Sequence, residues 1–193
     1  MFNSGITAEK LINEIRDEAD IALSIPDDSF MSWLNSLEQT LYSEIIKEQA
    51  ECEFDGDLSS IDKEGCDEVR FEDIHAVYAD GVQLKATTLT SGFIFPKTYY
   101  KKENNIAFSE DVGDKAIRIT YFVRPELKKA ENISDTTVML PPEFIDLAKA
   151  KLRGEAYKLA NEDGLAAKWL NDYNVLLETF KVWIQSKAPA FGI

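Results

Sequence analysis

The chain contains 193 residues with a formal net charge of −14, and 45% of its residues are hydrophobic. A chain of this length can bury a sizeable core without a metal or a disulfide, and this composition excludes wholesale disorder. The N-terminus lacks the basic segment and apolar run of a secretion signal, and no stretch holds the ~18 consecutive apolar residues of a membrane-spanning helix. The sequence therefore predicts a soluble protein that is made in the cytoplasm and has no membrane partner.

The acidic residues are concentrated in the first third of the chain. Residues 1–66 contain 16 acidic and 4 basic residues, whereas residues 67–193 contain 19 acidic and 17 basic residues. Direct binding to a nucleic-acid backbone is disfavoured, because that affinity comes from lysines and arginines that replace counterions. We expect either an ordinary solvated surface or a surface that repels phosphates or meets a basic partner.

Residues 1–47 predict a pair of helices. Thr7 is placed to cap the first helix, whose apolar residues recur at helical spacing from Leu11 onward. Pro26 predicts the end of that helix, because proline disfavours helical geometry in the residue before it. Asp27 and its two neighbours offer caps for the second helix. The short turn between the helices predicts antiparallel packing.

Residues 48–66 predict an acidic loop that is rich in glycine and serine. Asp55 and Asp57 match the start of an EF-hand calcium loop, but the required glycine is Ser60 and the required glutamate is Cys66. We therefore expect no calcium there. Cys52 and Cys66 are the two cysteines of the chain, and without a secretion signal reduced thiols are favoured over a disulfide.

Residues 67–124 predict an antiparallel β insertion. Apolar and polar residues alternate on both sides of the Asp80-Gly81 turn, which is typical of a hairpin. Similar alternation further along predicts two more strands, the last of which ends at Pro125. The expected strands cover residues 74–78, 82–86, 106–108 and 117–123.

A basic and aromatic cluster lies between these strands and consists of Lys97, Tyr99, Tyr100, Lys101 and Lys102. Lysines interleaved with aromatic rings are typical of proteins that bind single-stranded nucleic acid. A solvated hairpin tip explains the same pattern and is the interpretation favoured by the sequence. A third interpretation is a contact with the acidic region of a neighbouring copy, which would account for the segregation of charge along the chain.

Residues 141–187 predict a second pair of helices. Pro141 and Pro142 suit a helix start, where the missing amide hydrogens cost nothing. Two apolar stripes follow, separated by a polar break at residues 161–164. An apolar tail, residues 188–193, is expected beyond the last helix, where it could fray or insert into a partner.

Few residues in the chain point to chemistry. The single histidine, His75, lies within an expected strand, where a structural role is favoured. The sequence contains none of the short signatures of nucleophilic, metal, redox or phosphate-binding sites. Paired carboxylates carry no information about acid and base catalysis in so acidic a chain. We therefore expect no enzymatic activity and no cofactor or metal.

Six segments, taken in chain order, carry a resemblance to a known family. They are TAEKLINEIRDEADI, DDSFMSWLNSLEQTLYSEI, DIHAVYADGVQLKATT, AIRITYFVRP, LPPEF and AYKLANEDGLAAKWLNDYNVLLETF. The order and pattern of these segments resemble the head-to-tail connector, or adaptor, proteins of tailed bacteriophages. That family includes the tubular tail proteins that form a ring beneath the portal of short-tailed phages.

The resemblance implies an α+β fold in one adaptor domain spanning residues 1–193. Two N-terminal and two C-terminal helices would form an antiparallel bundle around a central antiparallel β insertion. Twelve identical copies would close into a ring in the neck of the virion, docked on the portal protein and on tail or nozzle proteins. The viral double-stranded DNA would pass through without specific binding.

Three sets of residues are expected to serve such a ring. An acidic lumen would repel duplex phosphates and consists of Glu51, Glu53, Asp55, Asp57, Asp62 and Glu64. The tail residues Pro189, Phe191 and Ile193 would contact the portal, and the cluster from Lys97 to Lys102 would contact a neighbouring subunit. The alternative function is an acidic interaction protein, such as a DNA mimic, that presents carboxylates to a basic groove of its partner.

Overall fold

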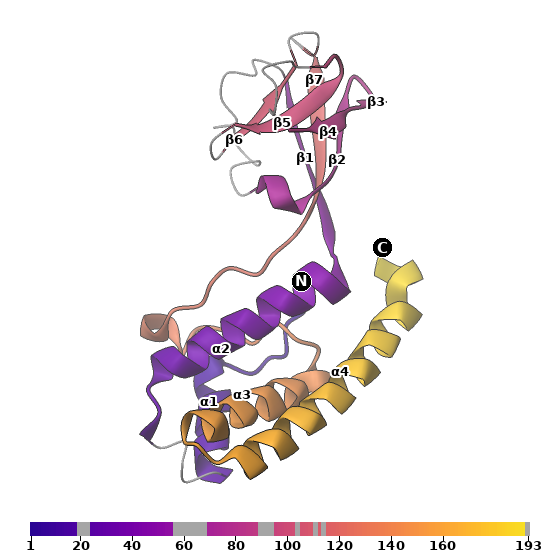
Figure 1. Ribbon diagram of the computed structural model, residues 1–193. Coiled ribbons are helices and arrows are strands. Elements are labelled where there is room, and N and C mark those ends of the chain that lie inside the picture. The colour runs from indigo at the N-terminus through magenta and orange to yellow at the C-terminus, as the bar shows by residue number, and fades with distance from the viewer. Residues whose placement is uncertain are drawn as a thin grey trace. The chain divides into compact units, whose positions relative to one another are not determined.

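The computed structural model shows an α+β protein that divides into two compact units (Figure 1). The helical unit combines residues 1–46 with residues 124–193, and the β unit comprises residues 47–123. For residues 54, 55, 105 and 188–191 only the backbone is described. The structure describes residues 1–18, 24–55, 69–88, 95–102, 105–109, 112 and 115–191.

The helical unit contains four α-helices from both ends of the chain. None of the described helices combines the length and the apolar character needed to cross a bilayer. A π-helical segment, Leu41–Ile46, directly continues the second helix, and the short 3-10 turn Pro142–Phe144 leads into the third. The helices are α1 (Ala8–Glu18), α2 (Asp27–Thr40), α3 (Ile145–Leu159) and α4 (Asp163–Phe191).

The starts of α1 and α2 differ in their capping. The amide of Lys10 donates to Thr7 Oγ1 at 3.2 Å, which confirms the predicted cap of α1. The predicted caps of α2 are wrong, because Asp27 is already the first helical residue and Pro26 takes the capping position. Proline has no side-chain acceptor, so α2 begins without a side-chain cap. The chain leaves the π-helical segment at Lys47, whose φ of 50° is left-handed.

The last helix is longer than predicted. The sequence pattern places its end near Lys187, but α4 continues to Phe191. Pro189 and Phe191 therefore belong to the helix backbone and do not lie beyond it. The alanines on both sides of Pro189 are strong helix formers, which favours continuation of the helix past Lys187.

The helical unit has a hydrophobic core of its own. Its described buried members come from residues 8–46 and 138–184. Phe144, before α3, packs 4.9 Å from Phe180 and 5.3 Å from Trp183, measured between ring centroids. Helices α3 and α4 run side by side and share the most extensive helix–helix contact of the unit (Figure 1). Both termini of the chain thus contribute to one core.

The β unit is built on a four-stranded antiparallel sheet with the order β1-β7-β2-β3 (Figure 1). The predicted hairpin at Asp80-Gly81 is confirmed, since β2 pairs with β3 across that turn. The strand predicted over residues 117–123 is confirmed as β7, and the structure places it between β1 and β2. The strands are β1 (Gln49–Asp55), β2 (Ile74–Ala79), β3 (Val82–Gln83) and β7 (Ala116–Phe122).

A second sheet of three strands has the order β4-β5-β6. Its last two strands are antiparallel, but β4 and β5 are parallel. The prediction of a wholly antiparallel insertion is therefore wrong in this sheet, because the alternation within each strand carries no information about its direction. The strands are β4 (Lys85–Thr87), β5 (Thr98–Lys102) and β6 (Asn105–Phe108).

The prediction of a loop over residues 48–66 is wrong for its first part. Gln49–Asp55 forms β1, which pairs with β7 along its whole length. Cys52 points into the core of the β unit with 7% of its surface exposed, and it is disulfide-bonded. The expectation of reduced thiols is therefore corrected, and Cys66, the other cysteine of the chain, lies outside the described residues.

The chain enters and leaves the β unit through paired strands. Gln49 lies opposite Phe122, and the amide of Val123 donates to the carbonyl of Glu48 at 2.8 Å. The first and last residues of the β unit are therefore neighbours, as expected for an insertion between two parts of a helical unit.

Candidate functional site

The outer face of the four-stranded sheet gathers three of the acidic residues predicted from the sequence. Glu51, Glu53 and Asp55 alternate along β1, and Cys52 between the first two is buried in the core, so the three positions share the outer face. Glu51 and Glu53 are exposed, and Thr120 Oγ1 lies 3.4 Å from Glu51 Oε1. β1 is one of the two edge strands, so this acidic row lies at the border of the sheet.

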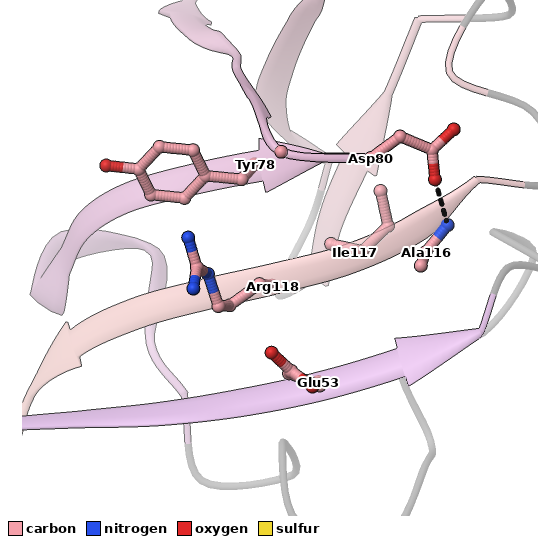
Figure 2. A pocket seen from close by; sticks show the side chains of 7 residues that line it. Glu53, Tyr78, Asp80, Ala116, Ile117 and Arg118 are labelled. Atoms are coloured by element: carbon pink, nitrogen blue, oxygen red, sulfur yellow. Dashed lines mark hydrogen bonds between the residues drawn. The ribbon is translucent and has the colours of Figure 1, made fainter.

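A cationic side chain lies next to this row. Arg118 on β7 is paired with Glu53 on one side and with Tyr78 on the other. Its guanidinium carbon lies 4.8 Å from the centroid of the Tyr78 ring, a cation–π contact. Figure 2 shows Arg118 between these two side chains. The positive charge of Arg118 therefore offsets part of the acidic potential of the sheet face.

These residues line a shallow hollow of about 450 Å³. The β2–β3 turn closes one end, where Asp80 Oδ1 accepts a hydrogen bond of 3.1 Å from the amide of Ala116 (Figure 2). Gly81 has a φ of 76°, which the tight turn requires and other residues rarely adopt. The hollow thus combines carboxylate, aromatic and guanidinium groups. Such groups can form hydrogen bonds and ring contacts with the polar surface of a partner.

The remaining acidic residues predicted for a lumen are not placed by the structure. Asp57, Asp62 and Glu64 lie outside the described residues, and Asp55 is described by its backbone alone. Glu51 and Glu53 are therefore the two members of the set whose exposure can be assessed.

The basic and aromatic cluster divides between core and surface. Tyr99 and Tyr100 are each 7% exposed, and burial raises the pKa of Tyr99. Lys97, Lys101 and Lys102 are exposed. The two rings therefore cannot serve as a stacking surface for bases, and any contact with a neighbouring copy would use the lysines. Lys101 forms an ion pair with Glu72 of the same chain.

The residues predicted to contact a portal lie at the end of α4. The backbones of Pro189 and Phe191 are helical, and their side chains are not described. Ile193 lies outside the described residues.

His75 lies at an irregularity in β2, where the pairing register with β7 shifts. Its ring is exposed and 5.3 Å from the ring of Phe122. Within the described ranges, His, Cys, Asp and Glu side chains form no group of three that could hold a metal ion.

Sequence patterns missed a buried ion pair in the helical unit. Glu38 on α2 is 1% exposed and pairs with Lys128 from the segment that returns from the β unit. The amide of Met139 also donates to Glu38 Oε1 at 2.7 Å. The sequence held one signal for this burial. Glu38 lies four positions after Leu34 and next to Leu37, so it falls within an apolar stripe of the helix.

A second missed group involves Arg153 on α3, which is 8% exposed and lies over Trp169 on α4. The helical pattern alone does not reveal the burial of Arg153, because α3 is buried on most of its faces.

Comparison of the chain with protein-family models and with curated protein sequences finds no match.

Proposed function

We propose that this protein is a structural, non-enzymatic subunit of the head-to-tail connector of a tailed bacteriophage. The observation that carries the proposal is the arrangement of the chain: one helical unit is assembled from residues 1–46 and 124–193, and a β unit is inserted between them. This order agrees with the arrangement that the sequence resemblance implies.

The finer features of the proposal follow from the same resemblance. The four helices form an antiparallel bundle, and twelve copies close into a ring at the neck of the virion. One side of the ring contacts the portal through Pro189, Phe191 and Ile193, and the other contacts tail or nozzle proteins. Neighbouring subunits meet through the exposed Lys97, Lys101 and Lys102.

The acidic row on β1 supports a role in DNA passage. Glu51 and Glu53 are exposed at the edge of a sheet, where a ring can present them to its lumen. Carboxylates repel duplex phosphates within roughly 10 Å at ordinary salt, so DNA slides past without binding. Arg118 moderates this repulsion locally.

Mass measurement and negative-stain electron microscopy test the proposal. The purified chain, alone or mixed with a portal protein of the same phage, is expected to form closed rings with a central channel. Small one-to-one complexes with a basic partner and no rings would favour the acidic interaction protein and would refute the connector. Turnover of a substrate by the isolated subunit would also refute it.

A further inference from the structure

A pocket in the helical unit is lined by none of the residues discussed for the ring. It has a volume of about 510 Å³, within the usual range for small-ligand sites. The end of α1 supplies Glu18, and α3 and α4 supply the other walls. Its lining residues are Glu18, Asp146, Lys149, Ala150, Arg153, Trp169, Asp172, Val175 and Leu176.

Arg153 is the buried charged group of this pocket. The side chain is 9% exposed, and its guanidinium carbon lies 4.6 Å from the centroid of the Trp169 ring. Glu18 forms an ion pair with Nη2, so that atom already has an anionic partner. Nε is also buried and has no hydrogen-bond partner among the described residues.

A buried N–H without an acceptor is costly, and more so when the group is charged. The Nε and Nη2 atoms form one edge of the guanidinium, and this edge matches the two oxygens of a carboxylate. Stacking on Trp169 holds the plane of the guanidinium. Glu18 already supplies an oxygen to Nη2, so the remaining cost is removed when a ligand brings an acceptor oxygen to Nε.

The other walls restrict what such a ligand can be. Trp169, Val175 and Leu176 provide an apolar wall, which favours an apolar group beside the acceptor. The lining contains three carboxylates, Glu18, Asp146 and Asp172, against two cations, Lys149 and Arg153. Lys149 is already engaged by Glu14 at 2.7 Å. A doubly charged anion such as phosphate is therefore disfavoured relative to a single carboxylate.

We propose that the pocket between α1, α3 and α4 binds a carboxylate carried on an apolar group, with Arg153 receiving the oxygens and Trp169, Val175 and Leu176 contacting the apolar part. The carboxylate comes either from a free aliphatic or aromatic acid or from an acidic side chain of a second copy of this chain. The recognition chemistry is the same for both sources.

The test titrates the full chain with 3-phenylpropionate, its neutral amide and inorganic phosphate, and follows the indole N–H signal of Trp169 by NMR. We expect saturable binding of the acid, with the amide about tenfold weaker because it lacks the charge-assisted hydrogen bonds. Equal binding of acid and amide, equal or tighter binding of phosphate, or an unmoved Trp169 signal would overturn the proposal.

Variants assign the effect to Arg153. Arg153→Met is expected to abolish the difference between acid and amide, whereas Arg118→Met, which removes another arginine that lies over a ring, should leave it unchanged. If Arg153→Met does not fold, the difference in affinity between acid and amide on the unmodified chain still tests the proposal.

Sedimentation distinguishes the two sources. If a second copy supplies the carboxylate, 3-phenylpropionate competes with self-association, whereas a free acid leaves the mass unchanged. Ring formation is measured separately, so failure of the connector proposal and failure of this pocket give different results. A pocket that holds only water in every titration contradicts the inference.

Discussion

Glu38 and Lys128 form a charged pair that is almost completely removed from water. Their side chains are 1% and 6% exposed, and Met139 adds a backbone N–H to the carboxylate. Burial raises the pKa of Glu38, and the attraction of Lys128 opposes this without overcoming it. Loss of Lys128 should therefore cost more free energy of unfolding than the intact pair contributes, because the carboxylate would remain buried without a counter-charge.

The two partners should respond unequally to mutation. Lys128→Met leaves a buried carboxylate without a counter-charge and is expected to lower the free energy of unfolding by about 3–5 kcal/mol at pH 7. Glu38→Gln also leaves Lys128 without a counter-charge, but the amide keeps the shape and an acceptor oxygen for Lys128, so we expect a smaller loss of about 1–3 kcal/mol. Chemical denaturation of both variants and of the double variant measures the difference.

The pH dependence of Lys128→Met provides an internal check. A carboxyl whose pKa is raised in the folded state binds its proton more readily there than in the unfolded chain. Stability from this group is therefore gained as pH falls through the folded pKa and lost as pH rises. Mild acidification should recover part of the loss in Lys128→Met. Glu178→Gln, which breaks the exposed pair with Lys181, should cost less than about 1 kcal/mol at either pH.

The exposed glutamates of β1 allow a test of DNA repulsion. In assembled rings, Glu51→Gln with Glu53→Gln is expected to increase retention of double-stranded DNA at low salt, because two carboxylates per subunit are lost. A gel-shift assay with linear duplex measures this. The matched control, Glu126→Gln with Glu131→Gln, removes the same charge from exposed positions of the helical unit. Equal retention by both pairs would count against an acidic lumen on β1.

At the scale of elements, one glycine sets how closely α3 and α4 approach. A Cβ at Gly154 would lie 2.7 Å from two side-chain atoms of Leu170 and 3.3 Å from its backbone nitrogen. In an exposed helix, glycine to alanine gains up to about 1 kcal/mol. Here the added methyl group must displace α4 or the Leu170 side chain.

Gly154→Ala is therefore expected to destabilise the protein by about 1–3 kcal/mol through overpacking. Thermal unfolding gives the measurement. Gly164→Ala is the control, because its Cβ meets nothing within 4 Å and it lies in the first turn of α4. That variant should be neutral or slightly stabilised. A Gly154→Ala variant as stable as Gly164→Ala would show that the two helices separate at little cost.

Long-range hydrogen bonds tie the segment that returns from the β unit to α2. The side-chain amide of Asn35 donates to the Lys128 carbonyl and accepts from the Lys128 amide, both at 2.8 Å. Gln39 donates to the Pro125 carbonyl. The segment therefore satisfies part of its backbone hydrogen bonding from a helix that lies far away in sequence.

At the scale of the whole molecule, the two units should fold separately. The described core of the helical unit draws on residues 8–46 and 138–184 alone, and the ends of the β unit are joined by strand pairing. Replacing residues 47–123 with a short glycine-rich loop should leave a folded helical unit with native-like helix content. Circular dichroism and NMR dispersion measure this.

Deletion of residues 1–46 is the contrasting variant. It removes α1, α2 and the π-helical segment from the same core, so the remaining helices are expected to lose cooperative unfolding. If the chain without residues 47–123 behaves in the same way, the helical unit depends on the β unit for its stability.

Much of the element order could be predicted from the sequence because it depends on local periodicity. The helical spacing in α1 and α4, the alternation in β7 and the Asp80-Gly81 turn each determine an element from a few neighbouring residues. β1 was not predicted because its outer positions are acidic, and acidic residues favour loops over strands. Only its pairing with β7 identifies the segment as a strand.

The candidate sites were less accessible to sequence reasoning. Glu51 and Glu53 were predicted as functional, but their neighbour Arg118 comes from a strand more than 60 residues away. Burial of Tyr99 depends on the core of the β unit, which no local pattern describes. Arg153 became a candidate only through its contact with Trp169 and its unpaired Nε.

The sequence by itself determined that the chain is acidic, that it alternates from helices to strands and back to helices, and where most of these elements lie. Tertiary structure decided the direction of β4 against β5, the burial of Glu38 with Lys128, and the pocket around Arg153. The physical reason is the range of the interactions. Helix and strand periodicity acts over a few residues, whereas burial and charge pairing depend on partners that only the folded chain brings together.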